Sequence, residues 1–393
     1  MIEKTISALA DQIRGVSYNK RDLHDKLDEN SIILLRANNI VEGKLNFRDV
    51  VYVDKNVVSA DQYLKDGDIL ISASSGSKKM VGKAASFHSK DKCTFGAFCK
   101  VVRPHDNIKE FLRIYFQSAT YRREISHLAL GANINNIRNE HINSLQVRVP
   151  DYRTRLQIIK VINTLQKIRD VRKQELKKLD ELIKARFVEM FGDPVLNSKK
   201  YPEKALANYI NFITSGSRGW SKYLTPKGKA WFLTIKNVKN SHIAINNIQS
   251  VEPPDSKEAQ RTKVKEGDLL ISITADLGRT GVVSSDIASH GTYINQHLTC
   301  IRLDTEFINP VYASYFLESV AGKRQFNSKN QNGVKAGLNF DAIKSLKIII
   351  PPIKKQNSFV SFVRQVDKSK VAVQKSLEET QKLYDSLMQE YFG

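Results

Sequence analysis

Residues 150–192, PDYRTRLQIIKVINTLQKIRDVRKQELKKLDELIKARFVEMFG, decide how the rest of the chain is organised. After the opening proline this stretch holds no further proline and no glycine before Gly192, and Leu, Ile, Lys, Arg, Gln and Glu dominate it. Such residues favour helix, so the stretch predicts one long helix. Its apolar residues recur at heptad spacing, which is typical of a coiled-coil seam. The seam positions are Ile158, Ile162, Leu165, Leu176, Leu179, Ile183 and Met190, and the arginines that interrupt them are Arg169, Arg172 and Arg186.

The end of the chain repeats this helix. Residues 351–393, PPIKKQNSFVSFVRQVDKSKVAVQKSLEETQKLYDSLMQEYFG, align with 150–192 without a gap, at a constant shift of 201 that places Pro351 on Pro150. The chain is therefore a tandem duplication. Because the chain leaves the first globular region along one helix and returns along the other, we expect an antiparallel coiled coil. The equivalent seam of the second helix is Phe359, Val363, Val366, Val373, Leu377, Tyr384, Leu387 and Tyr391.

The duplication also sets the domain boundaries. A chain of 393 residues is too long for one ordinary domain but fits two globular units of about 150 residues plus two helices. The interrupting arginines disfavour a symmetric pair of first helices and favour pairing of the first helix with the second. The expected segments are 1–149 (first globular unit), 150–192 (central helix), 193–350 (second globular unit) and 351–393 (C-terminal helix).

Shorter matches recur inside the two globular units. Residues 1–14 predict a short amphipathic helix, which residues 206–210 echo in the second unit. DGDILIS at 66–72 matches EGDLLIS at 266–272, and each reads as a turn followed by a buried strand. Strands and helices mix without regular alternation, which favours an α+β fold. Further expected strands are 32–40, 230–238, 142–150 and 343–351.

Several loops in each unit carry short polar and basic side chains after a buried strand. Such residues suit contacts with phosphates and base edges, although a surface loop without a partner is the plain alternative for any single loop. The candidate DNA contacts of the first unit are Arg14, Ser17, Tyr18, Arg36, Asn38, Ser74, Ser75, Ser77, Lys78, Lys79, Asn133, Asn135 and Asn136. Those of the second unit are Ser215, Ser217, Arg218, Trp220, Tyr223, Lys236, Asn237, Thr274, Arg279, Thr280, Asn332 and Lys335.

Charge points to the same kind of partner. The formal net charge is +21, of which residues 1–149 carry +6 and residues 193–350 carry +8. Positive charge on both units indicates a polyanion that both contact, and nucleic acid is the first candidate. Three cysteines and eight histidines show no disulfide or metal-ligand spacing, and no long apolar run predicts a membrane span. We expect a cytoplasmic protein with no catalytic residues and no metal.

The order of these motifs resembles a known family. Two unlike globular units each precede a long helix, Pro351 to Gln356 forms P-x-x-x-x-Q, FGDP at 191–194 leads into the second unit, and the xGDxLIS strands are paired. This arrangement is similar to the specificity subunit of type I restriction-modification systems over the whole chain. Arg155 departs from the pattern, because the first helix is expected to carry glutamine there.

The resemblance implies a non-catalytic subunit with two target-recognition domains that read the two halves of a bipartite site in double-stranded DNA. It also implies that the paired helices fix the spacing and dock methyltransferase subunits. No cofactor is expected in this chain, because the methyltransferase subunits would use S-adenosylmethionine and a restriction and translocation subunit would use ATP and Mg²⁺. The competing hypotheses are a stand-alone DNA-binding repressor and a coiled-coil scaffold that does not bind DNA.

Overall fold

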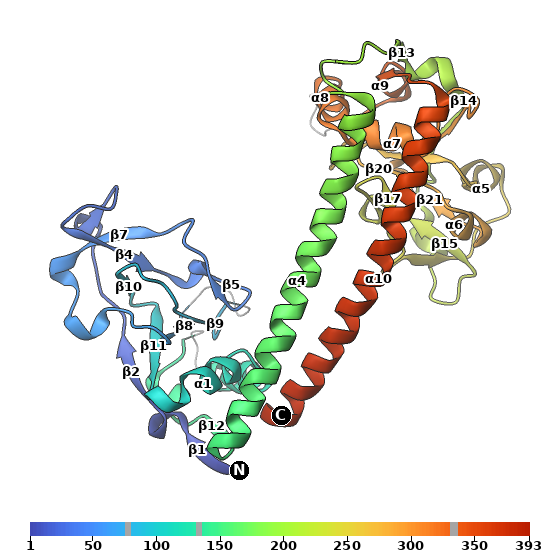
Figure 1. Cartoon of the computed structure of the whole chain (residues 1–393). Helices are drawn as coiled ribbons and strands as arrows, with labels where there is room; N and C mark the ends of the chain where they lie inside the picture. The colour runs from blue at the N-terminus through green and yellow to red at the C-terminus, as the bar shows by residue number, and fades with distance from the viewer. Residues whose placement is uncertain (75–79, 131–135, 331–336) are drawn as a thin grey trace. The chain divides into compact units, whose positions relative to one another are not determined.

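The computed structural model describes residues 1–74, 80–130, 136–330 and 337–393. The chain forms two compact units (Figure 1). Unit 1 combines Met1–Gln174 with Gln374–Gly393, and unit 2 is the continuous segment Glu175–Val373. The two long helices are α4 (Tyr152–Phe191) and α10 (Ile353–Phe392), each of 40 residues, which confirms both predicted helices. Each unit therefore contains one globular region and half of each helix.

Unit 1 is built on two four-stranded sheets. The first has the antiparallel order β2-β11-β8-β9, and the second has the order β10-β4-β7-β3, in which only β10 and β4 are parallel. Two shorter pairs, β1-β12 and β5-β6, complete it. The strands are β1 (Ile2–Thr5), β2 (Ala10–Arg14), β3 (Leu23–His24), β4 (Ser31–Leu35), β5 (Ile40–Val41), β6 (Lys44–Leu45), β7 (Val51–Asp54), β8 (Ile69–Ser72), β9 (Ala84–Ser86), β10 (Cys93–Phe95), β11 (Cys99–Pro104) and β12 (Gln146–Val149). The short helices are α1 (Lys109–Tyr115), α2 (Ala119–Leu130) and α3 (Asn139–Asn143).

Unit 2 repeats this plan. Its antiparallel sheet β14-β22-β19-β20 has the same order as the first sheet of unit 1, and β18-β15-β21, β13-β23 and β16-β17 accompany it. The mixture of sheets and short helices in both units confirms the α+β fold. The strands are β13 (Glu203–Ala205), β14 (Ile210–Ser215), β15 (Ala230–Leu233), β16 (Val238–Lys239), β17 (His242–Ile243), β18 (Gln249–Val251), β19 (Leu269–Ser272), β20 (Thr280–Val282), β21 (Tyr293–Ile294), β22 (Leu298–Leu303) and β23 (Lys347–Ile349). The helices are α5 (Lys257–Thr262), α6 (Ser285–Ser289), α7 (Pro310–Glu318), α8 (Val320–Ser328) and α9 (Phe340–Lys344).

The start of the chain does not form the predicted helix. Residues 1–14 run through β1, a short 3-10 turn at Ile6–Ala8 and β2 instead. β1 pairs with β12 and β2 pairs with β11, so distant strands decide the local structure. Residues 206–210 were expected to echo a helix, and they form a 3-10 turn at Leu206–Tyr209 that leads into β14.

A buried ion pair explains the aspartate of the xGDxLIS motif. In unit 2 the Asp268 carboxylate is fully buried and accepts two hydrogen bonds of 2.8 Å from the Arg302 guanidinium of β22. In unit 1 the buried Asp68 carboxylate accepts bonds of 2.8 and 2.7 Å from Arg103 of β11. Each preceding glycine adopts positive φ, 85° in unit 1 and 80° in unit 2, which a residue with Cβ disfavours. The motif therefore joins the two central strands of the equivalent sheets, β8 to β11 in unit 1 and β19 to β22 in unit 2.

The two long helices run antiparallel within each unit. In unit 1 the first half of α4 shares a core with the second half of α10, where the Phe111 and Phe392 rings lie 5.0 Å apart. In unit 2 the second half of α4 shares a core with the first half of α10, where Lys370 Nζ lies 2.5 Å from Asp180 Oδ1. The seams pack against the globular regions as well as against each other, so each helix half belongs to the core of its own unit.

The observed seam differs in part from the heptad prediction. Ile158, Ile162, Leu165 and Ile183 are buried as expected, whereas Leu176 is half-buried. On α10, Phe359, Val363, Val366, Val373 and Tyr384 are buried, and Leu377, Leu387 and Tyr391 are half-buried, as are Leu179 and Met190 of α4. The heptad pattern missed five buried apolar residues, Phe187, Phe191, Val360, Met388 and Phe392. They pack into the globular cores, which widens the apolar stripe beyond a two-helix seam.

The seam arginines contact aromatic rings of α10. The Arg169 guanidinium lies 4.6 Å from the Tyr384 ring centroid in unit 1, and the Arg186 guanidinium lies 5.6 Å from the Phe362 ring centroid in unit 2. A guanidinium over an aromatic face is favourable. Two of the predicted interruptions therefore stabilise the pairing of α4 with α10.

The start of each long helix is held by one polar side chain. Gln356 of α10 is fully buried, accepts from the Asn309 backbone N–H at 2.8 Å, and donates to the Phe307 and Pro351 carbonyls at 3.0 and 2.8 Å. Arg155 of α4 is buried and donates to the Asn107 carbonyl at 3.1 Å. Arg155 thus anchors the first helix to the segment before α1, much as Gln356 anchors the second helix to the segment before α7.

Candidate nucleic-acid interface

Three segments that are distant in sequence meet at one end of the first sheet of unit 1. The chain after β8 forms a bridge between Ser74 and Asn136, and the Ile137 N–H donates to the Ala73 carbonyl at 2.8 Å. The turn between β10 and β11 joins them, because the Ala73 and Ser74 N–H groups both donate to the Phe98 carbonyl, at 2.9 and 3.1 Å. We call the region defined by Ser74, Phe98 and Asn136 the strand-end surface of unit 1.

Unit 2 builds the same junction from equivalent segments. Thr274 forms a bridge with Gly337, and the Leu338 N–H donates to the Ile273 carbonyl at 3.0 Å. The Ile273 N–H donates to the His297 carbonyl at 3.0 Å. Thr274, His297 and Gly337 therefore define the strand-end surface of unit 2. In each unit the structure brings together two loops that the sequence singled out separately as candidate DNA contacts.

The side chains beside the two strand-end surfaces differ. In unit 1 the sheet register pairs Arg14 with Lys100, and the Lys100 ammonium donates to the Asn139 side chain. Partial burial, followed by the nearby Arg14 charge, lowers the pKa of Lys100. The equivalent register pair in unit 2 is Ser215 with Thr299. Two cations in one unit therefore correspond to two hydroxyls in the other, where Ser215 is half-buried and Thr299 is fully buried.

A second pair of candidate segments follows β4 and β15. Arg36 and Asn38 both contact Asp49: the Arg36 guanidinium lies 3.5 Å from its carboxylate and the Asn38 amide donates to it at 2.7 Å. Lys236 occupies the equivalent tip of unit 2 and is exposed. Unlike its neighbour, Asn237 is buried, and its side chain accepts from the Thr234 N–H at 2.9 Å and donates to the Ala244 carbonyl at 3.0 Å.

Four candidate DNA contacts of unit 2 are buried, and the structure corrects their expected exposure. Besides Asn237, the Ser217 hydroxyl lies 2.9 Å from the Thr262 hydroxyl, and the Thr280 hydroxyl lies 2.7 Å from the Ser314 hydroxyl. Trp220 is 3% exposed and stacks on Phe232 at 5.8 Å. These side chains already have partners inside the unit, so they support the fold rather than offer free groups to DNA.

The remaining candidates fall into three sets. The exposed ones are Arg14, Ser17, Asn38, Asn136, Arg218 and Lys236. Those that are half-buried are Tyr18, Arg36, Ser74, Ser215, Tyr223, Thr274 and Arg279, of which Arg279 forms an ion pair with Asp276. Eight candidates lie outside the described residues: Ser75, Ser77, Lys78, Lys79, Asn133, Asn135, Asn332 and Lys335.

The structure also adds residues that the sequence analysis missed. Phe98 belongs to the strand-end surface of unit 1, with Lys100 and Asn139 beside it, and His297 belongs to that of unit 2, with Gln296 beside it. The available signal was the duplication itself, because the turn GAFC at 96–99 occupies the place of NQHL at 295–298. In both units this turn bridges to the segment that follows the first strand of the sheet, at Val16 with Gly96 and at Ser217 with Asn295.

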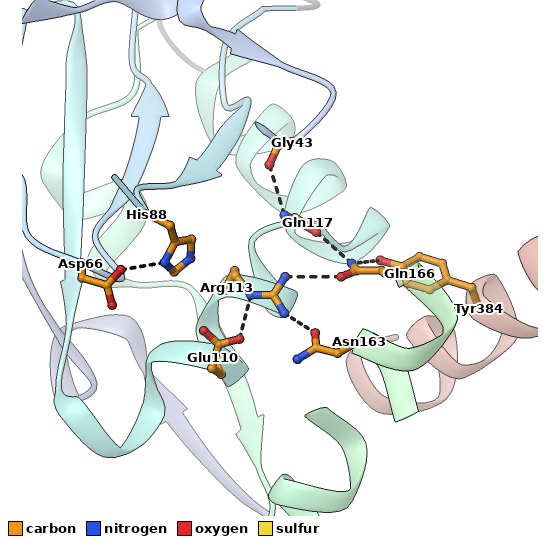
Figure 2. Close-up of polar contacts among 9 residues, drawn as sticks. All are labelled: Gly43, Asp66, His88, Glu110, Arg113, Gln117, Asn163, Gln166 and Tyr384. Atoms are coloured by element: carbon orange, nitrogen blue, oxygen red, sulfur yellow. Dashed lines mark hydrogen bonds and ion pairs between the residues drawn. The ribbon is translucent and has the colours of Figure 1, made fainter. Parts of the chain in front are cut away.

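A polar network ties the helix pair to the globular part of unit 1 (Figure 2). The Gln166 amide of α4 donates to Tyr384 Oη of α10 and to Gln117 Oε1, both at 3.2 Å. Arg113 of α1 donates to Gln166 Oε1 at 3.4 Å, and Gln117 donates to the Gly43 carbonyl at 3.3 Å. Helix α4, helix α10, α1 and the β5-β6 turn therefore share one network.

Unit 2 replaces this network with a titratable pair. His242 Nε2 of β17 lies 3.1 Å from both carboxylate oxygens of Asp367 on α10, and Lys370 lies 3.5 Å from the same carboxylate. The hydrogen bond to Asp367 raises the pKa of His242, against the effect of burial. Burial raises the pKa of Asp367, but His242 and Lys370 outweigh it and the net pKa is lowered.

This pair predicts a pH-dependent stability of unit 2. Because the folded pKa of His242 is raised above its unfolded value of about 6.5, its contribution is fully present below about pH 6.5. It is lost as the pH rises through the folded pKa. The His242 side chain is 42% exposed, so the loss should stay below about 1 kcal/mol.

Hydrogen exchange of β17 and of residues 354–373, corrected for intrinsic rates, should show this loss as the pH rises from about 6.5 through the raised pKa of His242. His242→Gln should remove the pH dependence, whereas Gln166→Ala in unit 1 should leave it in place. A profile of the His242→Gln variant that matches the unaltered chain would contradict the assignment.

Comparison with known proteins identifies the family. A family model described as the type I restriction modification DNA specificity domain matches residues 5–181 and again residues 204–382. The two matches follow the duplication and cover most of the chain. The chain belongs to the type I restriction-modification specificity family.

Full-length relatives agree with this family. The chain is 31% identical over 378 residues to the type I restriction enzyme EcoKI specificity subunit of Escherichia coli (strain K12), covering 92% of this chain and 81% of that protein. It is 29% identical over 378 residues to the StySPI specificity subunit of Salmonella potsdam, with the same coverage. The role of this family member is DNA sequence specificity.

Solved structures share the fold. The S subunit of a type I restriction-modification system from M. genitalium matches with a TM-score of 0.58 at 15% identity, covering 100% of this chain and 96% of that chain. A chain from a study of complex assembly and conformational transition of the type I R-M system matches with a TM-score of 0.56 at 14% identity, covering 100% and 97%. At these identities the likeness concerns the fold alone.

Two further observations concern this specificity-family chain. Within residues 1–74, 80–130, 136–330 and 337–393, no group of three His, Cys, Asp or Glu side chains is placed to hold a metal ion. No helix in that part of the chain combines the length and the apolar character that crossing a membrane requires.

Proposed function

We propose that this chain is the DNA-reading subunit of a type I restriction-modification complex and that each unit reads one half of an asymmetric bipartite target in double-stranded DNA. The observation that carries the proposal is the repeated framework with different side chains at its strand-end surfaces. The exposed Arg14 of unit 1 corresponds to the half-buried Ser215 of unit 2, and Phe98 corresponds to His297. Identical units would read identical half-sites, whereas unlike units should read unlike ones.

The helix pair has a separate role in this proposal, which is to set the spacer between the half-sites and to dock methyltransferase subunits. Each helix is unbroken over 40 residues. Both helices also keep apolar side chains exposed, such as Leu156 and Val171 on the first half of α4 and Leu383 on α10. In unit 2, Val188 and Val320 are further apolar residues, and they line a cavity of about 800 Å³. Exposed apolar residues on a helix favour a protein partner.

In this proposal the partner subunits, and not this chain, catalyse the reactions. Methyltransferase subunits would supply S-adenosylmethionine chemistry, and a restriction and translocation subunit would supply ATP hydrolysis with Mg²⁺. The chain itself would be non-catalytic and cytoplasmic. A stand-alone repressor would bind its target tightly without methyltransferase subunits, and a scaffold would show no sequence preference, so DNA binding with and without those subunits separates the three functions.

The charge contribution can be tested at Lys236. Replacing this exposed lysine with alanine should weaken DNA binding by the complete complex evenly across sequences, because a phosphate contact carries no sequence information. The slope of log affinity against log salt should fall in magnitude by about one. Fluorescence anisotropy at several salt concentrations measures both quantities. Lys354→Ala, at an exposed position in the first turn of α10, is the control and should leave the slope unchanged. An unchanged slope for Lys236→Ala would remove this residue from the interface.

A further inference from the structure

The turn between β10 and β11 presents an exposed aromatic ring on a rigid backbone. The Phe98 side chain is 73% exposed, although phenylalanine is usually buried. Its backbone is fixed on both sides, because its carbonyl accepts from two N–H groups and the Cys99 N–H donates to the Gly96 carbonyl at 2.8 Å. A single exposed apolar side chain is ordinary in itself. Phe98 is distinguished by its position in the strand-end surface and by the equivalent turn in unit 2.

The turn is packed backbone to backbone against the segment after β2. A Cβ atom on Gly15 would lie 2.2 Å from the Gly96 carbonyl oxygen, so no side chain fits between the two segments. Gly216 is held in the same way in unit 2, where a Cβ would lie 2.1 Å from the Asn295 carbonyl oxygen. Both units therefore hold the turn close to the first strand of the sheet, so the backbone of the turn loses little conformational freedom when a ligand binds.

Two cations lie on the strands next to this turn. Lys100 follows Phe98 by two residues, and Arg14 is the register partner of Lys100 on the neighbouring strand. Positive charge beside an exposed apolar ring suits DNA, because the cations attract phosphates while the ring contacts a base. Phenylalanine makes apolar contacts with the thymine methyl group and enters partly unstacked base steps.

Unit 2 places different chemistry at the same turn. His297 occupies the position of Phe98, and its Nδ1 lies 2.9 Å from the Thr274 hydroxyl. Gln296 precedes it, and both side chains are half-buried. An amide and an imidazole recognise hydrogen-bonding base edges, whereas a phenyl ring cannot.

We propose that Phe98 is a specificity-determining residue of unit 1 whose ring makes an apolar contact with a base of the first half-site, and that Gln296 and His297 contact base edges of the second. This inference rests on the proposed function and deepens it, since it assigns the difference between the half-sites to one turn of the fold.

The test uses the complete complex with its methyltransferase subunits. The motif methylated by the unaltered complex is read first, by sequencing modified bases in host DNA. Phe98→Ala should then relax one base pair of one half-site and weaken binding to the cognate duplex about 5- to 100-fold, the range expected for loss of one base contact. Phe98→Tyr keeps the ring and should retain the motif. The double variant Gln296→Ala/His297→Ala should relax the other half-site only.

The control variant is Leu27→Ala. Leu27 is 52% exposed and lies before the first residue of β4. The turn of Phe98 contacts the other end of that strand, where the Gly96 N–H donates to the Leu35 carbonyl. This control should change neither the motif nor the affinity. Melting temperatures of Phe98→Ala, Phe98→Tyr and Leu27→Ala should match the unaltered chain, because the side chains replaced are exposed.

The results of this experiment distinguish a failure of the inference about Phe98 from a failure of the proposed function. An unaltered motif and affinity in Phe98→Ala, with a bipartite motif for the unaltered complex, would overturn the role of Phe98 and leave the proposed function standing. Equal weakening on every sequence would also overturn it, because the ring would then not discriminate bases. No motif at all for the unaltered complex would overturn both.

Discussion

Arg302→Met should destabilise unit 2 by about 3 kcal/mol, which would be the largest single-residue effect among the variants described. The substitution leaves the Asp268 carboxylate, which is fully buried, without the guanidinium that now donates two hydrogen bonds to it. Breaking a buried ion pair on one side costs about 3–5 kcal/mol, and the lower end applies because the Arg302 side chain is 32% exposed. Hydrogen exchange of β19 and β22 in denaturant measures the loss.

Two companion variants sharpen this result. Asp268→Asn combined with Arg302→Met should recover part of the stability, because no unpaired charge remains buried. Arg324→Met removes an exposed arginine of the same unit and should cost less than about 0.5 kcal/mol. Exchange rates of β8 and β11 in unit 1 should stay unchanged in every case. A loss below about 1 kcal/mol for Arg302→Met would show that the xGDxLIS aspartate does not depend on its arginine.

Exchange of a whole unit should replace one half-site completely. We expect Glu175–Val373 to be the proper segment, because it is continuous and contains a complete core. In that core the Phe187 ring lies 5.7 Å from Tyr312 and 5.4 Å from Phe359, so α4, α7 and α10 all contribute. Replacing Glu175–Val373 with the equivalent segment of a family relative should change the second half-site and preserve the first.

The matched control is a graft of residues 193–350 alone. This graft keeps Phe187 and Phe359 from the present chain while their partners come from the relative, and such mismatched packing costs about 1–3 kcal/mol. It should therefore melt at a lower temperature than the graft of Glu175–Val373. If the larger graft also altered the first half-site, the two units would not read DNA independently.

The sequence predicted the features that depend on local pattern and duplication. Both long helices, the strands at Ile69–Ser72 and Leu269–Ser272 and the α+β class follow from periodicity, turn residues and internal alignment. The first strand of each sheet was harder to predict, because its partners lie far along the chain. Residues 10–14 pair with β11, which no local pattern reveals.

The sequence singled out loops that meet in the structure, but it did not predict which of their side chains are exposed. The sequence singled out the loops after β8 and β19 and the segments near Asn136 and Gly337, and the structure brings these together in each unit. Trp220 resembled an exposed contact because it follows a polar loop, but Phe232 and Tyr293 enclose it in a core. Phe98 was overlooked for the opposite reason, since an apolar side chain in a turn is expected to point inward.

The most direct test of the central claim is to sequence the modified bases of a host genome in which this chain is the only specificity subunit present with its methyltransferase subunits. Since the two strand-end surfaces share a framework but carry different side chains, we predict one motif made of two unequal half-sites separated by a spacer of fixed length and unspecified sequence. A host that lacks the chain should lose that motif. A palindromic motif, a single continuous motif or methylation that persists without the chain would contradict the account.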